Sequence, residues 1–329
     1  MYPFTFIKAK NNKEAIIALN KNANAKFIGG GTNIIDLMKM NIEKPEQLID
    51  INSLDLNKIE TLQNGNIKIG ALVRNSDLAY DETIMQKFLM LSKALLAGAS
   101  PQLRNMATTA GNVLQRTRCS YFYDTAMPCN KREPGSGCSA IKGYNRMHAI
   151  LGTSDKCVAT HPSDMCVALA ALDTIIHVES ANGERTINFL DFHLVPGDTP
   201  EKENVLQPGE LITAVEIPAL PFASNSTYIK VRDRHSYEFA LTSAAVALDI
   251  SNGTINNARI ALGGVGTKPW RAKEAEQSLI NKKATTENFS AAADIALKDA
   301  KTYQYNAFKP KLAKQTIISA LQTIGGNNG

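Results

Sequence analysis

All five cysteines of this 329-residue chain lie between positions 119 and 166. Cys119, Cys129, Cys138 and Cys157 fall in an irregular stretch rich in Gly, Pro, Ser and Arg, whereas Cys166 lies in an apolar run that predicts a helix. Thiolates are soft ligands, and four of them complete the shell of a tetrahedral metal ion or of an iron–sulfur cluster. The sequence therefore predicts a metal centre formed by the first four thiols. Cys166 is expected to be a buried structural residue, and it is the main rival for a ligand position.

The spacing of the four cysteines does not identify the metal. Nine, eight and eighteen residues separate them in turn, which differs from the short Cys-x-x-Cys runs of ferredoxins. An iron–sulfur cluster, a structural zinc ion and plain reduced thiols all remain open on spacing alone. The surrounding segment 113–162 carries seven basic and three acidic side chains, a net charge of +4. Positive charge beside a thiolate-bound cluster favours its reduced form, and the same charge also suits a solvated or partner-facing surface.

A second chemically informative segment is the run Phe27-Ile28-Gly29-Gly30-Gly31-Thr32-Asn33, which predicts a strand that enters a glycine turn. Glycines adopt backbone angles that other residues resist, so successive N–H groups can converge on an anion such as phosphate. The run does not fit G-x-G-x-x-G, because Ile34 stands where the third glycine belongs, and no Gly-Lys-Ser/Thr follows as in a P-loop. A phosphate site and an ordinary tight turn are both open.

A second small-residue segment, Thr108-Thr109-Ala110-Gly111-Asn112, follows about 80 residues after the first. It too offers backbone N–H groups and hydroxyls, and its small side chains let a ligand approach the backbone closely. The two segments together can hold one diphosphate from both sides.

The elements that position these residues are short and mixed. Helices are predicted at 12–20, 32–40, from Ser76 onward, 84–96 and 164–172, with Ser76 and Ser163 as N-caps. Strands are predicted at 25–28, 47–51, 67–72, 174–178, 185–188 and 211–217. After a boundary at 218–226 we expect strands at 227–232, 244–250 and 258–262, two or three helices, and a frayed tail at 325–329.

Composition and patterning exclude several functional classes. The net charge of +5 comes with no basic tail and no aromatic–basic stripe, so nucleic-acid binding is not expected. No apolar run approaches the roughly 20 residues that span a bilayer, and we expect no signal peptide in this chain. The five histidines show no metal-ligand spacing, and no nucleophile elbow supports hydrolase chemistry. His148 and His161 are candidate hydrogen-bond donors near the metal centre.

Taken in order, several motifs resemble the FAD-binding subunits of the molybdenum hydroxylases, the group that includes xanthine dehydrogenase and aldehyde oxidases. The motifs are Gly29-Gly30-Gly31-Thr32-Asn33, Ala107-Thr108-Thr109-Ala110-Gly111-Asn112, Ser163-Asp164-Met165-Cys166-Val167-Ala168-Leu169, Pro208-Gly209-Glu210-Leu211-Ile212 and Tyr228-Ile229-Lys230-Val231-Arg232-Asp233-Arg234. The resemblance covers essentially the whole chain. Ala110 departs from the pattern, since the group has glycine there.

The resemblance implies an α+β fold, with a two-part FAD-binding domain of the vanillyl-alcohol-oxidase type and a smaller α+β C-terminal domain like that of CO dehydrogenase flavoproteins. The expected limits are 1–55, 56–220 with an insertion at 113–162, and 223–329. Asp164 is expected to accept hydrogen bonds from flavin-side hydroxyls, Lys230 to reach the flavin ring and Ile212 to pack against FAD. The implied FAD-binding residues are Lys26, Phe27, Ile28, Gly29, Gly30, Gly31, Thr32, Asn33, Ile34, Thr108, Thr109, Gly111, Asn112, Asp164, Ile212 and Lys230.

The insertion is the instructive departure from the family pattern. Most such subunits run from the second glycine motif to the Ser-Asp motif within about ten residues, but here Val113 to Pro162 intervenes and contains all four clustered cysteines. This segment is similar to the 4Fe-4S loop of periplasmic aldehyde oxidase FAD subunits. The resemblance therefore favours a 4Fe-4S cluster bound by Cys119, Cys129, Cys138 and Cys157.

The resemblance also implies a function. The chain would be the electron-transfer subunit of a molybdenum-dependent aldehyde oxidoreductase, with a large subunit that holds the molybdenum cofactor and a small 2Fe-2S subunit as partners in a heterotrimer. Electrons would pass from the 2Fe-2S centres to FAD and then to an external acceptor, and no catalytic residue is expected in this chain. Co-export with a signal-bearing partner would place it in the periplasm, and the cytoplasm is the alternative.

Two other functions remain open on the sequence. One is a self-contained FAD-dependent NAD(P)H reductase with a structural zinc loop, against which the cysteine insertion argues. The other is a non-catalytic, zinc-bound interaction subunit with a degenerate flavin site. The metal and the flavin content separate all three.

Overall fold

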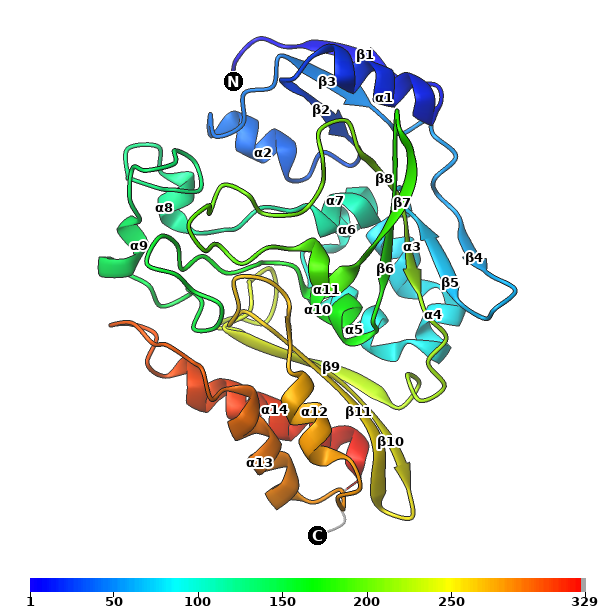
Figure 1. Cartoon of the computed structure of the whole chain (residues 1–329), viewed down its shortest axis with the longest axis vertical. Helices are drawn as coiled ribbons and strands as arrows, with labels where there is room; N and C mark the ends of the chain where they lie inside the picture. Colours follow the sequence, from blue (N-terminus) through cyan, green and yellow to red (C-terminus); the bar gives the residue numbers. More distant parts are fainter. Residues whose placement is uncertain (327–329) are drawn as a thin grey trace.

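Residues 1–326, which the computed structural model describes, form three β-sheets with helices packed between and around them (Figure 1). The N-terminus lies at one end of the long axis, and the last helix lies towards the other. The cysteine-bearing insertion projects to one side, at the left in Figure 1. The α+β fold expected from the sequence is confirmed, whereas the domain limits 1–55, 56–220 and 223–329 remain a proposal.

The first sheet is parallel and has the order β1-β3-β2. Its strands span Thr5–Lys8 (β1), Gln47–Asp50 (β3) and Ala25–Ile28 (β2). Parallel neighbours need crossover connections, which α1 (Asn12–Lys21) and α2 (Ile34–Lys39) provide. Asn11 caps α1 by accepting a hydrogen bond of 2.9 Å from the backbone N–H of Glu14. The glycine turn 29–31 leaves the sheet at the carboxyl end of β2.

The second sheet is antiparallel and has the order β4-β5-β8-β6-β7. Its strands span Ile59–Thr61 (β4), Ile67–Gly70 (β5), Leu211–Ile217 (β8), Ile175–Ser180 (β6) and Gly183–Asn188 (β7). Helices accompany it at Asn75–Tyr80 (α3), Glu82–Lys87 (α4), Leu89–Ala97 (α5), Pro101–Met106 (α6), Thr109–Val113 (α7), Asp164–Ala171 (α10) and Phe189–Phe192 (α11). Residues from the sheet, α5 and α10 share the largest hydrophobic core.

The third sheet is antiparallel and has the order β12-β11-β10-β9. Its strands span Trp270–Arg271 (β12), Thr254–Gly263 (β11), Thr242–Ser251 (β10) and Ser226–Val231 (β9), and the following helices span Lys273–Leu279 (α12), Thr286–Ala296 (α13) and Lys309–Gly325 (α14). Side chains alternate across a strand. Along β10, Ala245 and Ala247 therefore join the core around α10, while Ala244 and Val246 join the core under α12–α14.

The insertion contains the short helices α8 (Ser120–Tyr123) and α9 (Ser139–Lys142), and irregular chain connects them. Polar side chains fix its backbone. Asn145 accepts a hydrogen bond of 2.9 Å from the backbone N–H of Tyr305. The fully buried ammonium of Lys309 donates to the carbonyls of Met147, His148 and Gly264 at 3.0, 3.0 and 2.7 Å. The far C-terminal part of the chain thus holds the end of the insertion.

Three predicted elements differ from the structure. The helix predicted at 84–96 breaks at Phe88, because this side chain turns into the core and Ser226 accepts a hydrogen bond from the backbone N–H of Met90. Ser76 is not an N-cap, since α3 begins one residue earlier, where Asn75 donates to the carbonyl of Ala107. Gly325 is the last residue of α14 rather than part of a frayed tail, and positions 327–329 of that predicted tail lie outside the described residues. None of the helices between residues 1 and 326 is both long and apolar enough to cross a membrane.

A half-buried ion cluster ties the insertion to the rest of the molecule. Arg116 lies 2.7 Å from Glu43, which follows α2, and 2.9 Å from Glu203, while Lys131 lies 2.8 Å from Glu203. Burial alone would raise the pKa of Glu203, but Lys131 and Arg116 more than offset it, so this pKa lies below its ordinary value of 4.5. Glu203 is therefore ionised at neutral pH and holds both cations.

We expect Glu203→Gln to lower the free energy of unfolding by about 2 kcal/mol at pH 7, between the values typical of exposed and fully buried pairs. Because folding lowers the pKa of Glu203, its stabilisation is complete above the ordinary pKa and is lost as the pH falls through the folded value. Denaturant unfolding at pH 7 and at about pH 3 should therefore show that the difference in free energy of unfolding between the wild-type protein and Glu203→Gln is smaller in acid. Glu184→Gln, at an exposed position on β7, is the control. A difference that is independent of pH would contradict the prediction.

Candidate functional site

The glycine turn after β2 presents a row of free backbone donors. None of the six N–H groups from Gly29 to Ile34 donates to another atom of the described chain. Gly31 has a φ of +72°, which favours glycine at this position. The buried side-chain amide nitrogen of Asn33 also has no partner within residues 1–326. The six residues are half-exposed, and such a concentration of unpaired donors before and at the start of α2 suits an anionic ligand.

The second small-residue segment lies directly against the first. A Cβ built on Gly30 would lie 1.9 Å from the carbonyl oxygen of Met106, and one on Gly29 would lie 3.1 Å from Oγ1 of Thr108. Arg74 spans the junction, since it donates to the carbonyl of Met106 and, at 3.1 Å, to the side chain of Asn52. The two segments that the sequence predicts to cooperate therefore form one cradle, which we call the glycine cradle (29–34 and 106–112).

Within the second half of the cradle, the polar side chains have different roles. Thr108 caps α7 by accepting a hydrogen bond of 3.2 Å from the N–H of Gly111. Thr109 is fully buried and donates to the carbonyl of Val73, so its hydroxyl supports the fold. Asn112 accepts a hydrogen bond of 2.6 Å from Ser163, which links the cradle to the start of α10.

Asp164 and Lys230, predicted from motifs 66 residues apart, form a buried ion pair. Their side-chain atoms Oδ2 and Nζ lie 2.8 Å apart, and only 9% and 4% of the two side chains are exposed. The hydroxyl of Tyr228 donates to the other oxygen of Asp164 at 2.5 Å, and Lys230 also donates to the carbonyl of Ala97 at 3.1 Å. Burial and the carboxylate of Asp164 raise the pKa of Tyr228. The pair joins α10 to β9 and places a compensated charge at the edge of a cavity.

This large cavity, of about 340 Å³, lies where the insertion, the start of α10 and the third sheet meet. Residues from all three parts line it, including Cys119, His148, Ser163, Asp164, Phe239 and Gly264. Lys26 and Ile212 do not line it, since Lys26 is exposed on β2 and Ile212 is buried in β8. The cavity combines apolar and aromatic walls with a few polar groups, as is typical of cofactor sites.

The four clustered cysteines line a second, much smaller cavity of about 10 Å³ in the insertion. Cys129 and Cys138 are paired by a short β-bridge, and Cys119 lines both cavities. Within the described chain no three of these sulfur atoms lie within 4.8 Å of one another. Burial raises the pKa of Cys119 to about 12 and that of Cys157 to about 11, so both are protonated unless a metal displaces the proton. Cys166 does not line this cavity.

His148 lines the large cavity and contacts Cys119. Its Nε2 is 3.0 Å from the sulfur of Cys119, and its buried Nδ1 has no partner in the described chain. Burial and the nearby ammonium of Lys309 lower the pKa of His148 to about 4, so the ring is neutral at pH 7 and its Nε2–H can donate to the sulfur. The expected donor near the cysteines is therefore found at His148.

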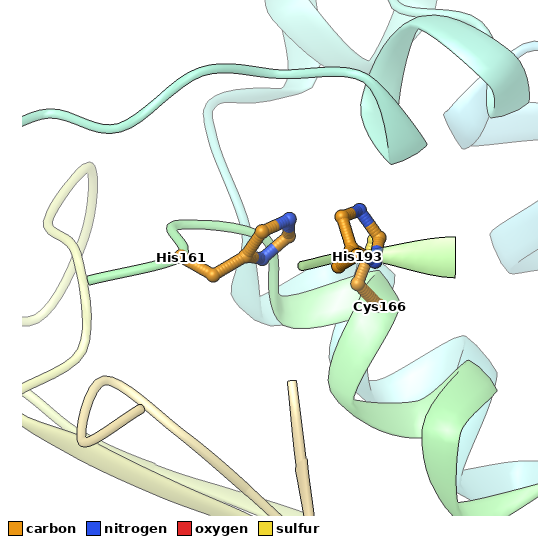
Figure 2. Close-up of side chains that lie close together, drawn as sticks. All are labelled: His161, Cys166 and His193. Atoms are coloured by element: carbon orange, nitrogen blue, oxygen red, sulfur yellow. The ribbon is translucent and has the colours of Figure 1, made fainter. Parts of the chain in front are cut away.

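His161, by contrast, lies beside Cys166 and His193, away from the four-cysteine cavity (Figure 2). The sequence gives no signal for this grouping, because His193 is remote from the other two residues and no ligand motif connects them. Tyr228 was likewise absent from the predicted site residues, although it lies two positions before Lys230 on the same face of β9.

Two family models match the chain. Residues 2–220 match the FAD binding domain in molybdopterin dehydrogenase, and residues 227–324 match the CO dehydrogenase flavoprotein C-terminal domain. The chain belongs to the FAD-binding subunits of the molybdenum hydroxylases. The family expected from the sequence motifs is therefore confirmed, and members of this family are subunits of oxidoreductase complexes.

Individual relatives agree over nearly their whole length. The chain is 49% identical over 322 residues to the aldehyde oxidoreductase FAD-binding subunit PaoB of Escherichia coli K12, with 98% of each chain covered. It is 30% identical over 301 residues to the glyceraldehyde dehydrogenase medium chain of Sulfolobus acidocaldarius, with 91% of this chain and 88% of the relative covered. Carbon monoxide dehydrogenase from Hydrogenophaga pseudoflava matches in structure with a TM-score of 0.76 at 25% identity, with 98% of each chain covered.

We expect Gly30→Ala to weaken FAD binding by at least about tenfold, because the added methyl group must separate the two halves of the glycine cradle at a cost above roughly 1.4 kcal/mol. The measurement is FAD content after purification and the dissociation constant from flavin fluorescence. Gly183→Ala is the control, since a Cβ there meets nothing within 4 Å and only its positive φ is strained. Undiminished FAD affinity in Gly30→Ala would show that the cradle does not hold the cofactor.

Proposed function

We propose that this chain is the FAD- and 4Fe-4S-binding electron-transfer subunit of a molybdenum-dependent aldehyde oxidoreductase. Electrons would reach FAD from 2Fe-2S centres of a partner and leave to an external acceptor. The observation that carries the proposal is the position of Cys119, which lines both the four-cysteine cavity and the large cavity beside Asp164. A single residue thus separates the two places where redox groups would lie.

The four-cysteine cavity gathers the thiols that a cluster requires, since all four clustered cysteines line it. In a 4Fe-4S cluster each of the four thiolates binds a different iron. A tetrahedral zinc ion takes four thiolates at about 2.3 Å. The metal content of the purified protein therefore separates the two.

The glycine cradle fits the diphosphate of FAD. Its free N–H groups from Gly29 to Ile34 would bind phosphate oxygens, and the missing side chain of Gly30 lets the second half of the cradle pack against the first. Asn33 offers a further unpaired amide donor. FAD supplies one- and two-electron chemistry when bound.

Asp164 and Lys230 would set the electrostatics of the flavin end of the site. Their ion pair keeps a cation on β9 within reach of the large cavity without adding net charge. A fixed cation beside a redox group stabilises added negative charge more effectively in a buried site than in water. The hydrogen bond from Ser163 to Asn112 links the start of α10, where Asp164 lies, to the cradle.

Partners and location are part of the same proposal. The relatives include an aldehyde oxidoreductase subunit and a glyceraldehyde dehydrogenase medium chain, which supports aldehyde oxidation in a large molybdenum-bearing partner with a small 2Fe-2S subunit. We propose a heterotrimer that is exported to the periplasm with a signal-bearing partner. Cell fractionation of the co-expressed complex tests the location, and recovery in the cytoplasm would overturn it.

The decisive experiment is anaerobic purification with co-expressed partners, followed by quantification of iron, zinc and flavin per chain. We expect about four irons and one FAD in the wild-type protein. Cys138→Ser should lose the cluster absorbance and most of the iron while it retains flavin. Cys166→Ala is the matched control and should keep both, because Cys166 does not line the four-cysteine cavity. One zinc per chain, or unchanged iron in Cys138→Ser, would contradict the proposed cluster.

His148→Leu should lower the reduction potential of the cluster by roughly 40 mV, because about 1 kcal/mol of hydrogen bonding to the sulfur of Cys119 stabilises the more negative, reduced state. An EPR-monitored redox titration measures the midpoint directly. His148→Gln keeps an N–H donor and should retain most of the wild-type value. Equal potentials in all three proteins would mean that His148 has only a packing role.

A further inference from the structure

A second group of metal-ligand side chains lies outside the four-cysteine cavity and outside the glycine cradle. It consists of His161, Cys166 and His193, whose ligand atoms all lie within 4.8 Å of one another (Figure 2). His161 precedes the N-cap of α10, Cys166 lies in the first turn of that helix, and His193 caps the C-terminus of α11. Three segments of chain thus converge on one point.

Two members of the group are buried, His161 is half-buried, and two of its nitrogens have no hydrogen-bond partner in the described chain. Cys166 is fully buried, and His193 is 6% exposed. His193 donates through Nε2 to the carbonyl of Val113 at 3.0 Å, which leaves its Nδ1 as the lone-pair nitrogen, and that atom has no partner in the described chain. Nε2 of His161 is also buried without a partner in residues 1–326. Two such nitrogens in one place are costly unless a ligand satisfies them.

Aromatic packing explains where the rings of His161 and His193 lie, but it does not give their unpaired nitrogens a hydrogen-bond partner. The ring of His193 packs edge-on against Phe189, Phe192 and His161, with centroids 5.4, 4.9 and 4.5 Å away. Nδ1 of His161 accepts a long hydrogen bond of 3.4 Å from the backbone N–H of Ser163. This contact is lost when the proton of the neutral ring moves to Nδ1, which is the tautomer that leaves Nε2 free to bind a metal ion. Burial lowers the pKa of His193 to about 4 and also lowers that of His161, so both rings are neutral and can act as ligands.

The donor set and the surrounding charge select the ion. Two imidazoles and one thiolate are borderline to soft ligands, which suit Cu⁺ or Zn²⁺ rather than Ca²⁺ or Mg²⁺. With Cu⁺ the bound group is neutral, whereas Zn²⁺ leaves a net charge of +1 in a buried position. Lys131 and Arg118 already repel positive charge at His161, and Glu203 is engaged by Lys131 and Arg116. Burial of an additional uncompensated charge is unfavourable.

We propose that His161, Cys166 and His193 form a buried, three-coordinate site for a single Cu⁺ ion. Binding replaces the S–H bond of Cys166 by a Cu–S bond and releases one proton to solvent, with no change in oxidation state. The ion connects the chain before α10 to the segment that follows α11. It therefore restrains the first turn of α10, which carries Ser163 and Asp164. The site does not depend on a cluster at the other four cysteines.

The test uses the purified, flavin-containing protein under anaerobic conditions, with Cu⁺ supplied as its complex with bathocuproine disulfonate. The wild-type protein should withdraw one equivalent of Cu⁺ from the chelator and show a higher melting temperature. Copper X-ray absorption should show one sulfur and two nitrogen neighbours. Cys166→Ala and His193→Gln should each lose this equivalent of Cu⁺ and the thermal shift. His193→Gln keeps an N–H donor for the carbonyl of Val113, so it serves as the test if Cys166→Ala fails to fold.

Two controls separate this site from other ligands. His177→Gln removes a histidine that contacts Glu216 on the second sheet, and Cys138→Ser removes one of the four clustered thiols. Both should retain the equivalent of Cu⁺ with one sulfur and two nitrogens. Uptake that persists in Cys166→Ala and His193→Gln, or no uptake by the wild-type protein, would overturn the proposal. Tighter binding of Zn²⁺ than of Cu⁺ by the same three residues would overturn the assignment of a monovalent ion.

Discussion

The site depends on one close contact between two backbones, that of Gly30 with the carbonyl of Met106. A Cβ at residue 30 would lie 1.9 Å from that oxygen, so the contact exists only because the residue is glycine. It joins the parallel sheet near the N-terminus to the antiparallel sheet that follows, and neither half of the glycine cradle is complete without the other. The small residues of the two segments allow this close approach, and the N–H groups of residues 29–34 stay unpaired within the described chain.

The insertion is connected to three other parts of the molecule. Arg116 and Lys131 form ion pairs with Glu43 and Glu203. Asn145 accepts a hydrogen bond from the backbone N–H of Tyr305. Lys309 donates to the carbonyls of Met147 and His148. Irregular chain is normally mobile because it buries little apolar surface, and these polar contacts provide the missing restraint. Cys119, which lines both cavities, and His148, which contacts it from the large cavity, are consequently restrained by the rest of the molecule.

Local sequence patterns predicted most of the framework but not its long-range pairings. β2, β8 and the Ser163 cap of α10 were predicted with nearly the observed bounds, because alternation and capping are local properties. The break at Phe88 was missed because Ser226, 136 residues away along the chain from Met90, determines where α5 begins. Asp164 and Lys230 were each expected, from family motifs, to contact the flavin, and their ion pair with one another was not predicted. The meeting of His161, Cys166 and His193 had no local signal at all. Such contacts arise from the packing of sheets, which the spacing of residues does not encode.

The anchoring of the insertion by Lys309 and Tyr305 has a consequence for biosynthesis. Residues 113–162 leave the ribosome long before α14 is made, so the four-cysteine cavity cannot take its final shape while the chain is still growing. Its thiols stay exposed to solvent and to cellular oxidants during that interval. The final restraint on the insertion is therefore a late step in folding, and loss of α14 would remove the three hydrogen bonds that Lys309 donates.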